Sequence, residues 1–129
     1  MLNSRTVALA LGFTFIAVTA LGFIPNPLVS PDGLFAVNLA HNLVHLVTGL
    51  GFIVGVLMFT GRENLVIKVI GALYSVVAIV GFFTTGDMLL GVIHINQADR
   101  WLHLGLAVAI TVCGYVFRPA TSDRITHQG

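Results

Sequence analysis

Residues 38–46 read NLAHNLVHL and residues 96–104 read NQADRWLHL, so one polar pattern occurs twice, at an offset of 58. Asn, Ala, His and Leu recur at matching positions, and His41 falls on Asp99. With one residue of slippage, residues 22–24 (GFI) also match residues 81–83 (GFF). We therefore expect two copies of one structural unit, each ending in a segment that carries this pattern.

The composition is that of a protein solvated by lipid. Of the 129 residues, 57% are hydrophobic and only 9% are charged, whereas a soluble domain devotes about a quarter of its residues to charge. The net charge of +1 gives no reason to expect a nucleic-acid partner. Cys113 is the single cysteine, which excludes an internal disulfide framework.

Four apolar stretches are long enough for transmembrane helices, since a bilayer core of about 30 Å requires about 20 residues. Pro25 and Pro27 end the first stretch, and Ser30-Pro31-Asp32 predicts an N-cap, a first-turn proline and an acid that open the second. The helices are predicted at residues 6–24, 31–60, 64–83 and 87–117, followed by a polar tail at 118–129.

The predicted fold is an all-α integral membrane protein, a four-transmembrane-helix bundle in a single domain. Because the loops are short, the unit is a helical hairpin, and both copies enter the membrane in the same direction. The two tandem hairpins are then related by a pseudo-twofold axis along the membrane normal.

Positive charges lie at one set of predicted helix ends and predict cytoplasmic termini by the positive-inside rule. These residues are Arg5, Arg62, Lys68, Arg118 and Arg124, while Asp32 and Asp87 lie at the other ends. Arg100 beside Trp101 is the exception and is expected to anchor the outer interface. Counting about 20 residues back from the inner ends places the outer boundary near Leu39 and Ala98, so the second and fourth helices are expected to project beyond the lipid.

Residues three or four apart share a helix face, so the repeated pattern forms two polar stripes. We call them together the polar cluster: Asn38, His41, Asn42 and His45 in one stripe, and Asn96, Asp99 and His103 in the other. Intramembrane polar groups face a bundle interior, and the stripes are expected to face each other in the outer half of the bilayer. Gly49 and Gly105 are expected to permit close helix approach.

One interpretation of the polar cluster is structural. Each Asn or His would then form an interhelical hydrogen bond, worth about 0.6–2 kcal/mol. His41 and Asp99 would form an ion pair or hydrogen bond between the repeats.

A second interpretation is a metal site. His41, His45, Asp99 and His103 have i, i+4 spacing within each stripe, and three His with one Asp suit Zn²⁺ or another transition metal. Asn38, Asn42 and Asn96 would then orient the imidazoles. No catalytic constellation accompanies these residues, so an enzyme is not predicted.

A third interpretation is a tetrapyrrole. His45 and His103 would supply two axial ligands to haem b, or one of them would hold the magnesium of a chlorophyll. His94 is expected at the surface, and His127 lies in the polar tail. A continuous polar path for ions is not visible below the cluster.

The motifs N-x-A-H-N-x-x-H-L-x-x-G (residues 38–49) and N-x-A-D-x-x-x-H-L (residues 96–104) resemble those of an uncharacterised bacterial family. Its members are short four-span membrane proteins, known only as a domain of unknown function, and the resemblance covers nearly the whole chain. Arg100 stands where the family often has Asn, and the later glycine is displaced to Gly105. The resemblance implies the fold and a bacterial inner membrane, but no activity.

These observations together predict a non-enzymatic binding or accessory subunit. Its partners would be the lipid bilayer and either other membrane subunits or a second copy of the chain, because its apolar outer surface is large for a protein of 13.7 kDa.

Overall fold

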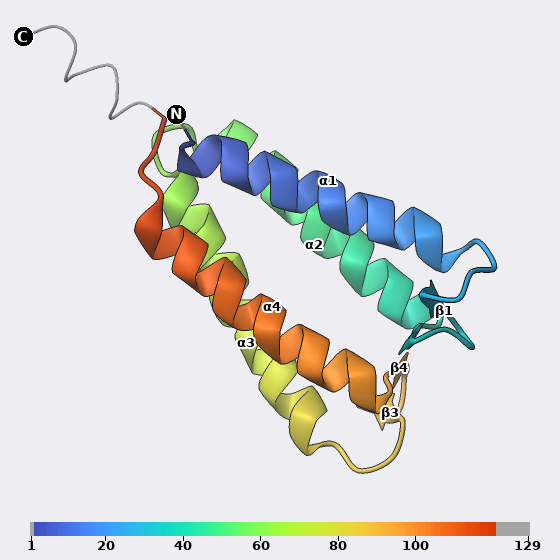
Figure 1. Ribbon diagram of the computed structural model, residues 1–129. Helices are drawn as coiled ribbons and strands as arrows, with labels where there is room; N and C mark the ends of the chain where they lie inside the picture. The colour runs from blue at the N-terminus through green and yellow to red at the C-terminus, as the bar shows by residue number, and fades with distance from the viewer. Residues whose placement is uncertain (1, 121–129) are drawn as a thin grey trace, which may run out of the picture.

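The computed structural model describes residues 2–120 and is mostly helical. Its helices are α1 (Ser4–Gly22), α2 (Leu39–Met58), α3 (Glu63–Phe83) and α4 (Gln97–Val116). Figure 1 shows α1 packed along α2 and α3 along α4, so the chain forms two helical hairpins. Arg124 and His127 lie outside the described residues.

Short strands join the helices of each hairpin at one end of the bundle, which we call the strand end. In the first hairpin, β1 (Val29–Ser30) pairs in parallel with β2 (Phe35–Ala36). In the second, β3 (Met88–Leu89) pairs antiparallel with β4 (Ile93–His94). At the opposite end, which we call the turn end, residues 59–62 connect α2 to α3.

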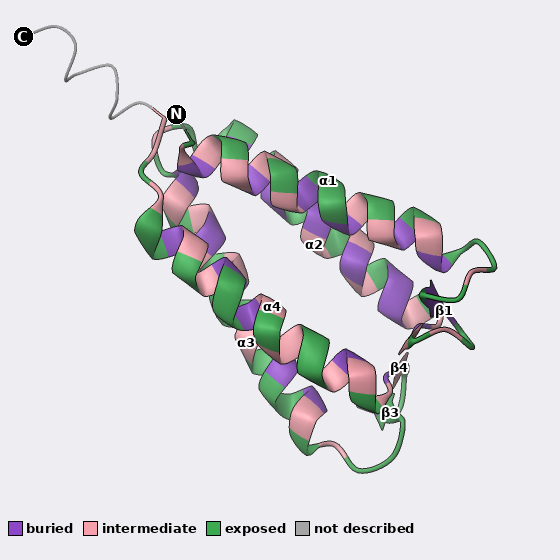
Figure 2. Cartoon of the chain, in the orientation of Figure 1, coloured by how far each residue is buried: buried purple, intermediate pink, exposed green. Residues whose placement is uncertain are grey.

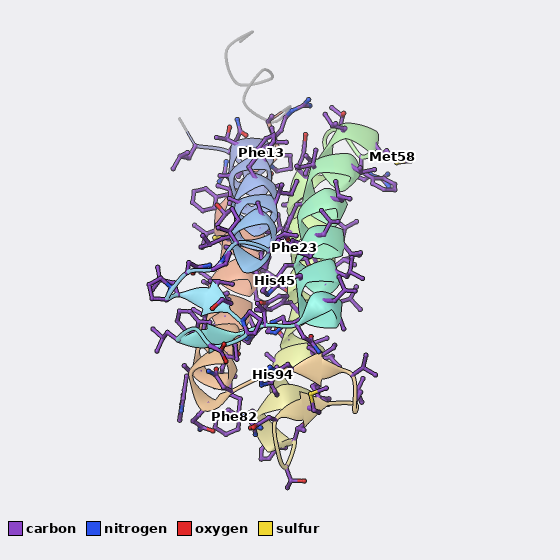
Figure 3. The ribbon with its side chains drawn as sticks, turned by 90° about the vertical axis from the view of Figure 1, so that its right-hand side faces the viewer. Phe13, Phe23, His45, Met58, Phe82 and His94 are labelled. Carbon is purple, nitrogen blue, oxygen red and sulfur yellow. The ribbon has the colours of Figure 1, made fainter. Side chains whose placement is uncertain are left out.

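Within the described chain, α1, α2 and α3 are long and apolar enough to cross a membrane. Large apolar side chains point outward from them; Phe13, Phe23 and Met58, labelled in Figure 3, are all more than half exposed. The helix α4 begins with a more polar segment that contains Asp99 and Arg100, although Val108 and Val112 of its second half are also mostly exposed.

The predicted starts of the second and fourth helices are wrong, because α2 begins at Leu39 and α4 at Gln97. The Ser30 hydroxyl donates to the Asn26 carbonyl and does not cap a helix. The caps are Asn38 and Asn96, whose side chains accept from backbone N–H groups three residues later, each at 3.0 Å. The helices therefore start at or next to Leu39 and Ala98, the residues near which the lipid boundary was predicted.

The two hairpins bury equivalent positions, and Figure 2 shows buried and exposed residues alternating along the helices. The buried residues of α1 recur in α3 at an offset of 59: Ser4, Ala8, Gly12, Phe15, Thr19 and Gly22 correspond to Glu63, Ile67, Gly71, Tyr74, Ala78 and Gly81. The buried residues of α4 correspond to buried residues of α2 at an offset of 58: Asp99, Ala107, Ile110 and Gly114 match His41, Gly49, Phe52 and Val56. Both hairpins thus turn the same faces toward the common core.

Glycine allows α1 and α2 to approach closely. A Cβ atom on Gly49 would lie 2.8 Å from the Gly12 carbonyl oxygen, and a Cβ on Gly12 would lie 2.9 Å from the Gly49 carbonyl oxygen. This agrees with the role predicted for Gly49. The same prediction for Gly105 is wrong, because a Cβ there would meet no atom within 4 Å.

A backbone hydrogen bond joins the first and last helices at the turn end. The Ser4 N–H donates to the carbonyl of Arg118 at 2.8 Å. The start of α1 and the residues that follow α4 are therefore neighbours.

Candidate metal centre

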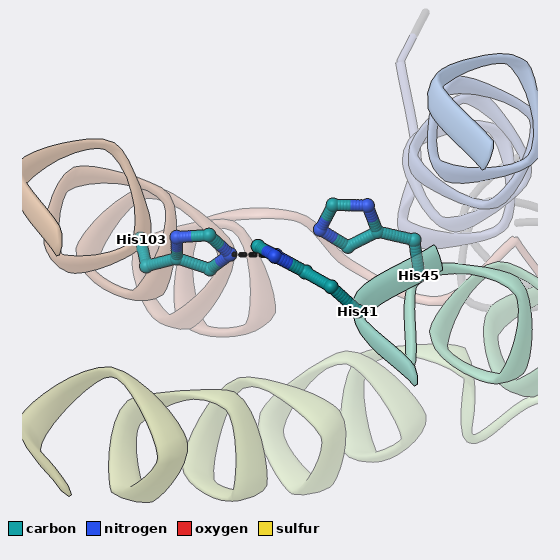
Figure 4. A group of neighbouring side chains, drawn as sticks. All are labelled: His41, His45 and His103. Atoms are coloured by element: carbon teal, nitrogen blue, oxygen red, sulfur yellow. Dashed lines mark hydrogen bonds between the residues drawn. The ribbon is translucent and has the colours of Figure 1, made fainter. Parts of the chain in front are cut away.

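Three histidines converge between the hairpins near the strand end. One turn of α2 places His41 and His45 on the same face, and α4 supplies His103 (Figure 4). One nitrogen from each ring lies within 4.8 Å of the other two. His41 and His45 are 2% and 6% exposed, and His103 is half-buried.

Backbone carbonyls determine which nitrogens of His41 and His103 carry protons. Nδ1 of His41 lies 2.6 Å from the carbonyl oxygen of His94, and Nδ1 of His103 lies 2.5 Å from that of Asp99. A carbonyl oxygen only accepts, so each Nδ1 must donate. A neutral imidazole carries one N–H, and Nε2 of both rings is then an unprotonated lone pair.

These two Nε2 atoms are only 3.3 Å apart, the contact drawn as a dashed line in Figure 4. Two neutral rings with these tautomers would direct one acceptor at another, which is not a hydrogen bond. A proton shared between the two rings, or a metal ion bound to both, would make this contact favourable.

His45 has no hydrogen bond that would compete with a ligand. Its Nδ1 is buried without a partner in the described chain, and its ring lies 4.6 Å from that of His41 and 5.9 Å from that of His103, between centroids. Buried polar atoms without a partner are uncommon and call for an explanation.

Asp99, the fourth predicted ligand, has a different partner for its side chain. The carboxylate accepts from the backbone N–H of Asn96 at 3.0 Å, which completes a capping box at the start of α4. The convergent set is therefore three histidines, and only the carbonyl of Asp99 contacts this set.

The expected pair between His41 and Asp99 is replaced by two bonds to backbone. Nδ1 of His41 donates to the His94 carbonyl in β4, and the Asp99 carboxylate accepts from the backbone N–H of Asn96 at the start of α4. No ion pair joins the two side chains in residues 2–120.

The predicted asparagines bond to backbone and not to imidazoles. Nδ2 of Asn38 donates to the Val92 carbonyl and Nδ2 of Asn96 to the Leu34 carbonyl, each at 2.8 Å. Asn42 donates to the Gly22 carbonyl at 3.2 Å and so links α2 to α1. The imidazoles are oriented instead by carbonyls, including that of His94, whose backbone role no side-chain pattern could reveal.

A cavity of about 30 Å³ adjoins His41 and His103. Tyr74 of α3 lines it and stacks on His103, with 5.6 Å between ring centroids and 17° between planes. Arg100 also lines it. The terminal nitrogens of Arg100 donate to the carbonyls of Thr84 and Gly86, so this side chain holds the loop after α3.

The cavity beside His103 is too small for a tetrapyrrole. The rings of His45 and His103 are nearly parallel with centroids 5.9 Å apart, and the adjoining cavity of about 30 Å³ is far smaller than a macrocycle. A single ion requires no such space.

Comparison with known proteins places the chain in a family. No curated protein and no solved structure matches it. The model of a family described as a domain of unknown function (DUF4383) matches residues 5–116. This match covers most of the 129 residues, and the chain therefore belongs to the DUF4383 family.

Proposed function

We propose that this protein is a four-span membrane protein that binds one first-row transition-metal ion through His41, His45 and His103. Zn²⁺ is the first candidate. The observation that carries the proposal is the 3.3 Å contact between two Nε2 atoms that both lack a proton in the neutral rings.

The geometry of this contact matches a coordination edge. Zn–N bonds of about 2.0–2.1 Å in a tetrahedral site separate two ligand nitrogens by about 3.3–3.4 Å. Metal-bound imidazoles usually donate their other N–H to a carbonyl or carboxylate, as His41 and His103 do. Neutral imidazoles suit Zn, Cu, Fe and Ni, so the donor set selects this class of metal over Mg²⁺ or Ca²⁺.

The second candidate function is structural, with a proton shared between His41 and His103. The reciprocal bonds of Asn38 and Asn96 favour a role in joining the hairpins. This alternative leaves the third imidazole unexplained, because His45 converges on the other two rings and its buried Nδ1 has no partner in the described chain. The metal is therefore preferred.

The same proposal includes α4 as the fourth span and a pseudo-twofold relation between the hairpins. Matched burial at offsets of 58 and 59 supports this relation. Arg62, Lys68 and Arg118 at the turn end favour cytoplasmic termini. The histidines would then lie in the outer half of a bacterial inner membrane.

The protein would act as a non-enzymatic binding or accessory subunit of a larger membrane assembly, or as a homo-oligomer. The support is its apolar exterior, where exposed side chains include Val47, Val69, Leu73 and Val108.

Metal analysis of the detergent-purified protein tests the proposal. We expect about one transition-metal ion per chain, and visible ligand-field bands when Co²⁺ is substituted. His41→Gln, His45→Gln and His103→Gln should each weaken binding by more than the roughly 10–100-fold that loss of an outer-shell partner costs. His94→Gln is the matched control, because it leaves the backbone carbonyl that His41 uses. Equal metal content in all four variants, or none in the wild type, would refute the metal site.

A further inference from the structure

A groove runs along the outside of the bundle between α2 and α3. Two adjoining hollows of about 360 and 240 Å³ form it, and Gly51 and Ile70 line both of them. The α2 wall consists of residues four positions apart, which lie on one helix face: Val47, Gly51, Gly55 and Phe59. Because the two glycines have no side chains, the middle of this wall is hollow. We call the whole feature the α2–α3 groove.

The α2–α3 groove has the length and surface that suit a lipid acyl chain. On α3 it extends from Arg62 to Val77, about 22 Å at 1.5 Å per residue, whereas one leaflet contributes about 15 Å of hydrocarbon. Beyond Arg62 the exposed residues of this wall are apolar, and Leu65, Val69 and Leu73 are each half or more exposed. One acyl chain can therefore lie along the groove from its turn end.

Among the residues that line the groove, Arg62 is the charged one, and it lies at the turn end. Its side chain is exposed and has no hydrogen-bond or ion-pair partner in the described chain. Glu63, the acid at this end of residues 2–120, is 0% exposed, whereas Arg118 is exposed. The accessible charge at the turn end is therefore positive, and basic sites between transmembrane helices on the cytoplasmic side bind anionic lipid headgroups.

We propose that the α2–α3 groove binds one anionic phospholipid of the cytoplasmic leaflet, with an acyl chain along the apolar walls and the headgroup phosphate at Arg62. This inference rests on the proposed membrane position of α2 and α3 and is independent of the metal site. A helix of a second copy would also cover the apolar walls, but it would bring no anion to Arg62, because Glu63 is buried. Partner subunits would then contact other faces of the bundle, such as that of Val108 on α4.

Native mass spectrometry of the detergent-purified protein tests the inference, with dioleoylphosphatidylglycerol and dioleoylphosphatidylcholine added at equal concentration. The two lipids have identical chains, so only the headgroup charge differs. We expect the wild type to retain one phosphatidylglycerol in preference to phosphatidylcholine. Arg62→Gln should lower this preference roughly 5-fold, the effect of one basic residue near anionic lipid, and it removes no cap, because the Arg62 side chain does not cap α3. Arg118→Gln is the matched control, since Arg118 is exposed at the same end but does not line the groove.

Gly51→Leu tests the groove itself. A Cβ atom on Gly51 would have its nearest contact at 3.7 Å, with Cδ1 of Ile70, so a larger side chain can enter the groove without displacing backbone. We expect this variant to lose both lipids. Gly105→Leu should lose neither, because a Cβ on Gly105 meets no atom within 4 Å and the residue lies on α4, outside the groove.

The outcomes separate this inference from the metal site. Absence of a phosphatidylglycerol preference in the wild type, or an equal preference in Arg62→Gln and Arg118→Gln, overturns the lipid site. Equal lipid binding in Gly51→Leu and Gly105→Leu also overturns it, as does a lipid-free wild-type dimer that Gly51→Leu dissociates. If Gly51→Leu does not fold, the two arginine variants decide. Metal content is measured on the same samples, so a metal-free protein that keeps its lipid preference overturns the metal site alone.

Discussion

Asn38 and Asn96 exchange hydrogen bonds between the hairpins: each caps its own helix through Oδ1, and each donates through Nδ2 to the loop that precedes the other helix. The acceptors, Val92 and Leu34, are themselves related by the offset of 58. One residue type thus begins a helix and joins two halves of the protein.

Asn38→Ser and Asn96→Ser separate these two roles. Serine also caps helices but cannot reach the opposite loop, so each variant should lose about 0.6 kcal/mol, the average for an interhelical hydrogen bond in a membrane protein. Unfolding by SDS in mixed micelles measures the change. Asn3→Ser is the control, because Asn3 caps α1 and its side chain bonds only to Thr6 in the described residues. An equal loss in all three variants would show that only capping matters.

Gly49→Ala should destabilise the first hairpin. The added methyl would lie 2.8 Å from the Gly12 carbonyl oxygen, and overpacking of this kind costs about 1–3 kcal/mol. Gly105→Ala should be neutral or stabilise by up to about 1 kcal/mol, because the position is open and alanine favours the helix. The same SDS titration compares them, and equal stabilities would contradict the close approach of α1 and α2.

Removal of the metal should loosen the contact between hairpins, since His41 and His103 lie on different hairpins. A ligand at 100 times its Kd stabilises the folded state by about 2.7 kcal/mol. We therefore expect a membrane-permeant chelator to lower the SDS midpoint of the wild type and of His94→Gln. His45→Leu should respond less. A midpoint that the chelator leaves unchanged in the wild type would favour the structural alternative.

Reporter fusions test whether α4 spans the membrane. Alkaline phosphatase, which is active only outside the cytoplasm, should be inactive when fused after residue 62 or 118 and active after residue 32 or 86. These positions follow from the orientation that Arg62, Lys68 and Arg118 indicate. Activity after residue 118 would mean that α4 does not return the chain to the cytoplasm.

The apolar stretches predicted where the helices of the described chain lie but not where α2 and α4 begin, and three of the helices are long and apolar enough to cross a bilayer. They did not predict the strands, since the two-residue pairs at Val29–Ser30 and Phe35–Ala36 carry no periodic signal. Asn38 and Asn96 were assigned to helix faces, although Asn is also a preferred cap. That second preference determined where α2 and α4 begin.

The residues of the candidate metal centre were likewise predictable only in part. His41, His45 and His103 were predictable together, because i, i+4 spacing and the repeated motif both single them out. Asp99 was assigned as a ligand although Asn96-x-x-Asp99 also fits a capping box, and the cap is what forms. The place of Tyr74 against His103 depends on how α3 packs on α4, which no motif within one helix encodes.

The hydrogen bond between the Ser4 N–H and the Arg118 carbonyl joins the start of α1 to the residues that follow α4. Both hairpins begin and end at the turn end. Each helix would therefore keep its direction if the order of the hairpins were exchanged and the connection at residues 59–62 were cut. A circular permutant that joins residue 118 to residue 4 through a short linker and opens at Gly61 would insert the second hairpin first. It should fold to the same core with the same three histidines together, although its two hairpins are synthesised in the reverse order.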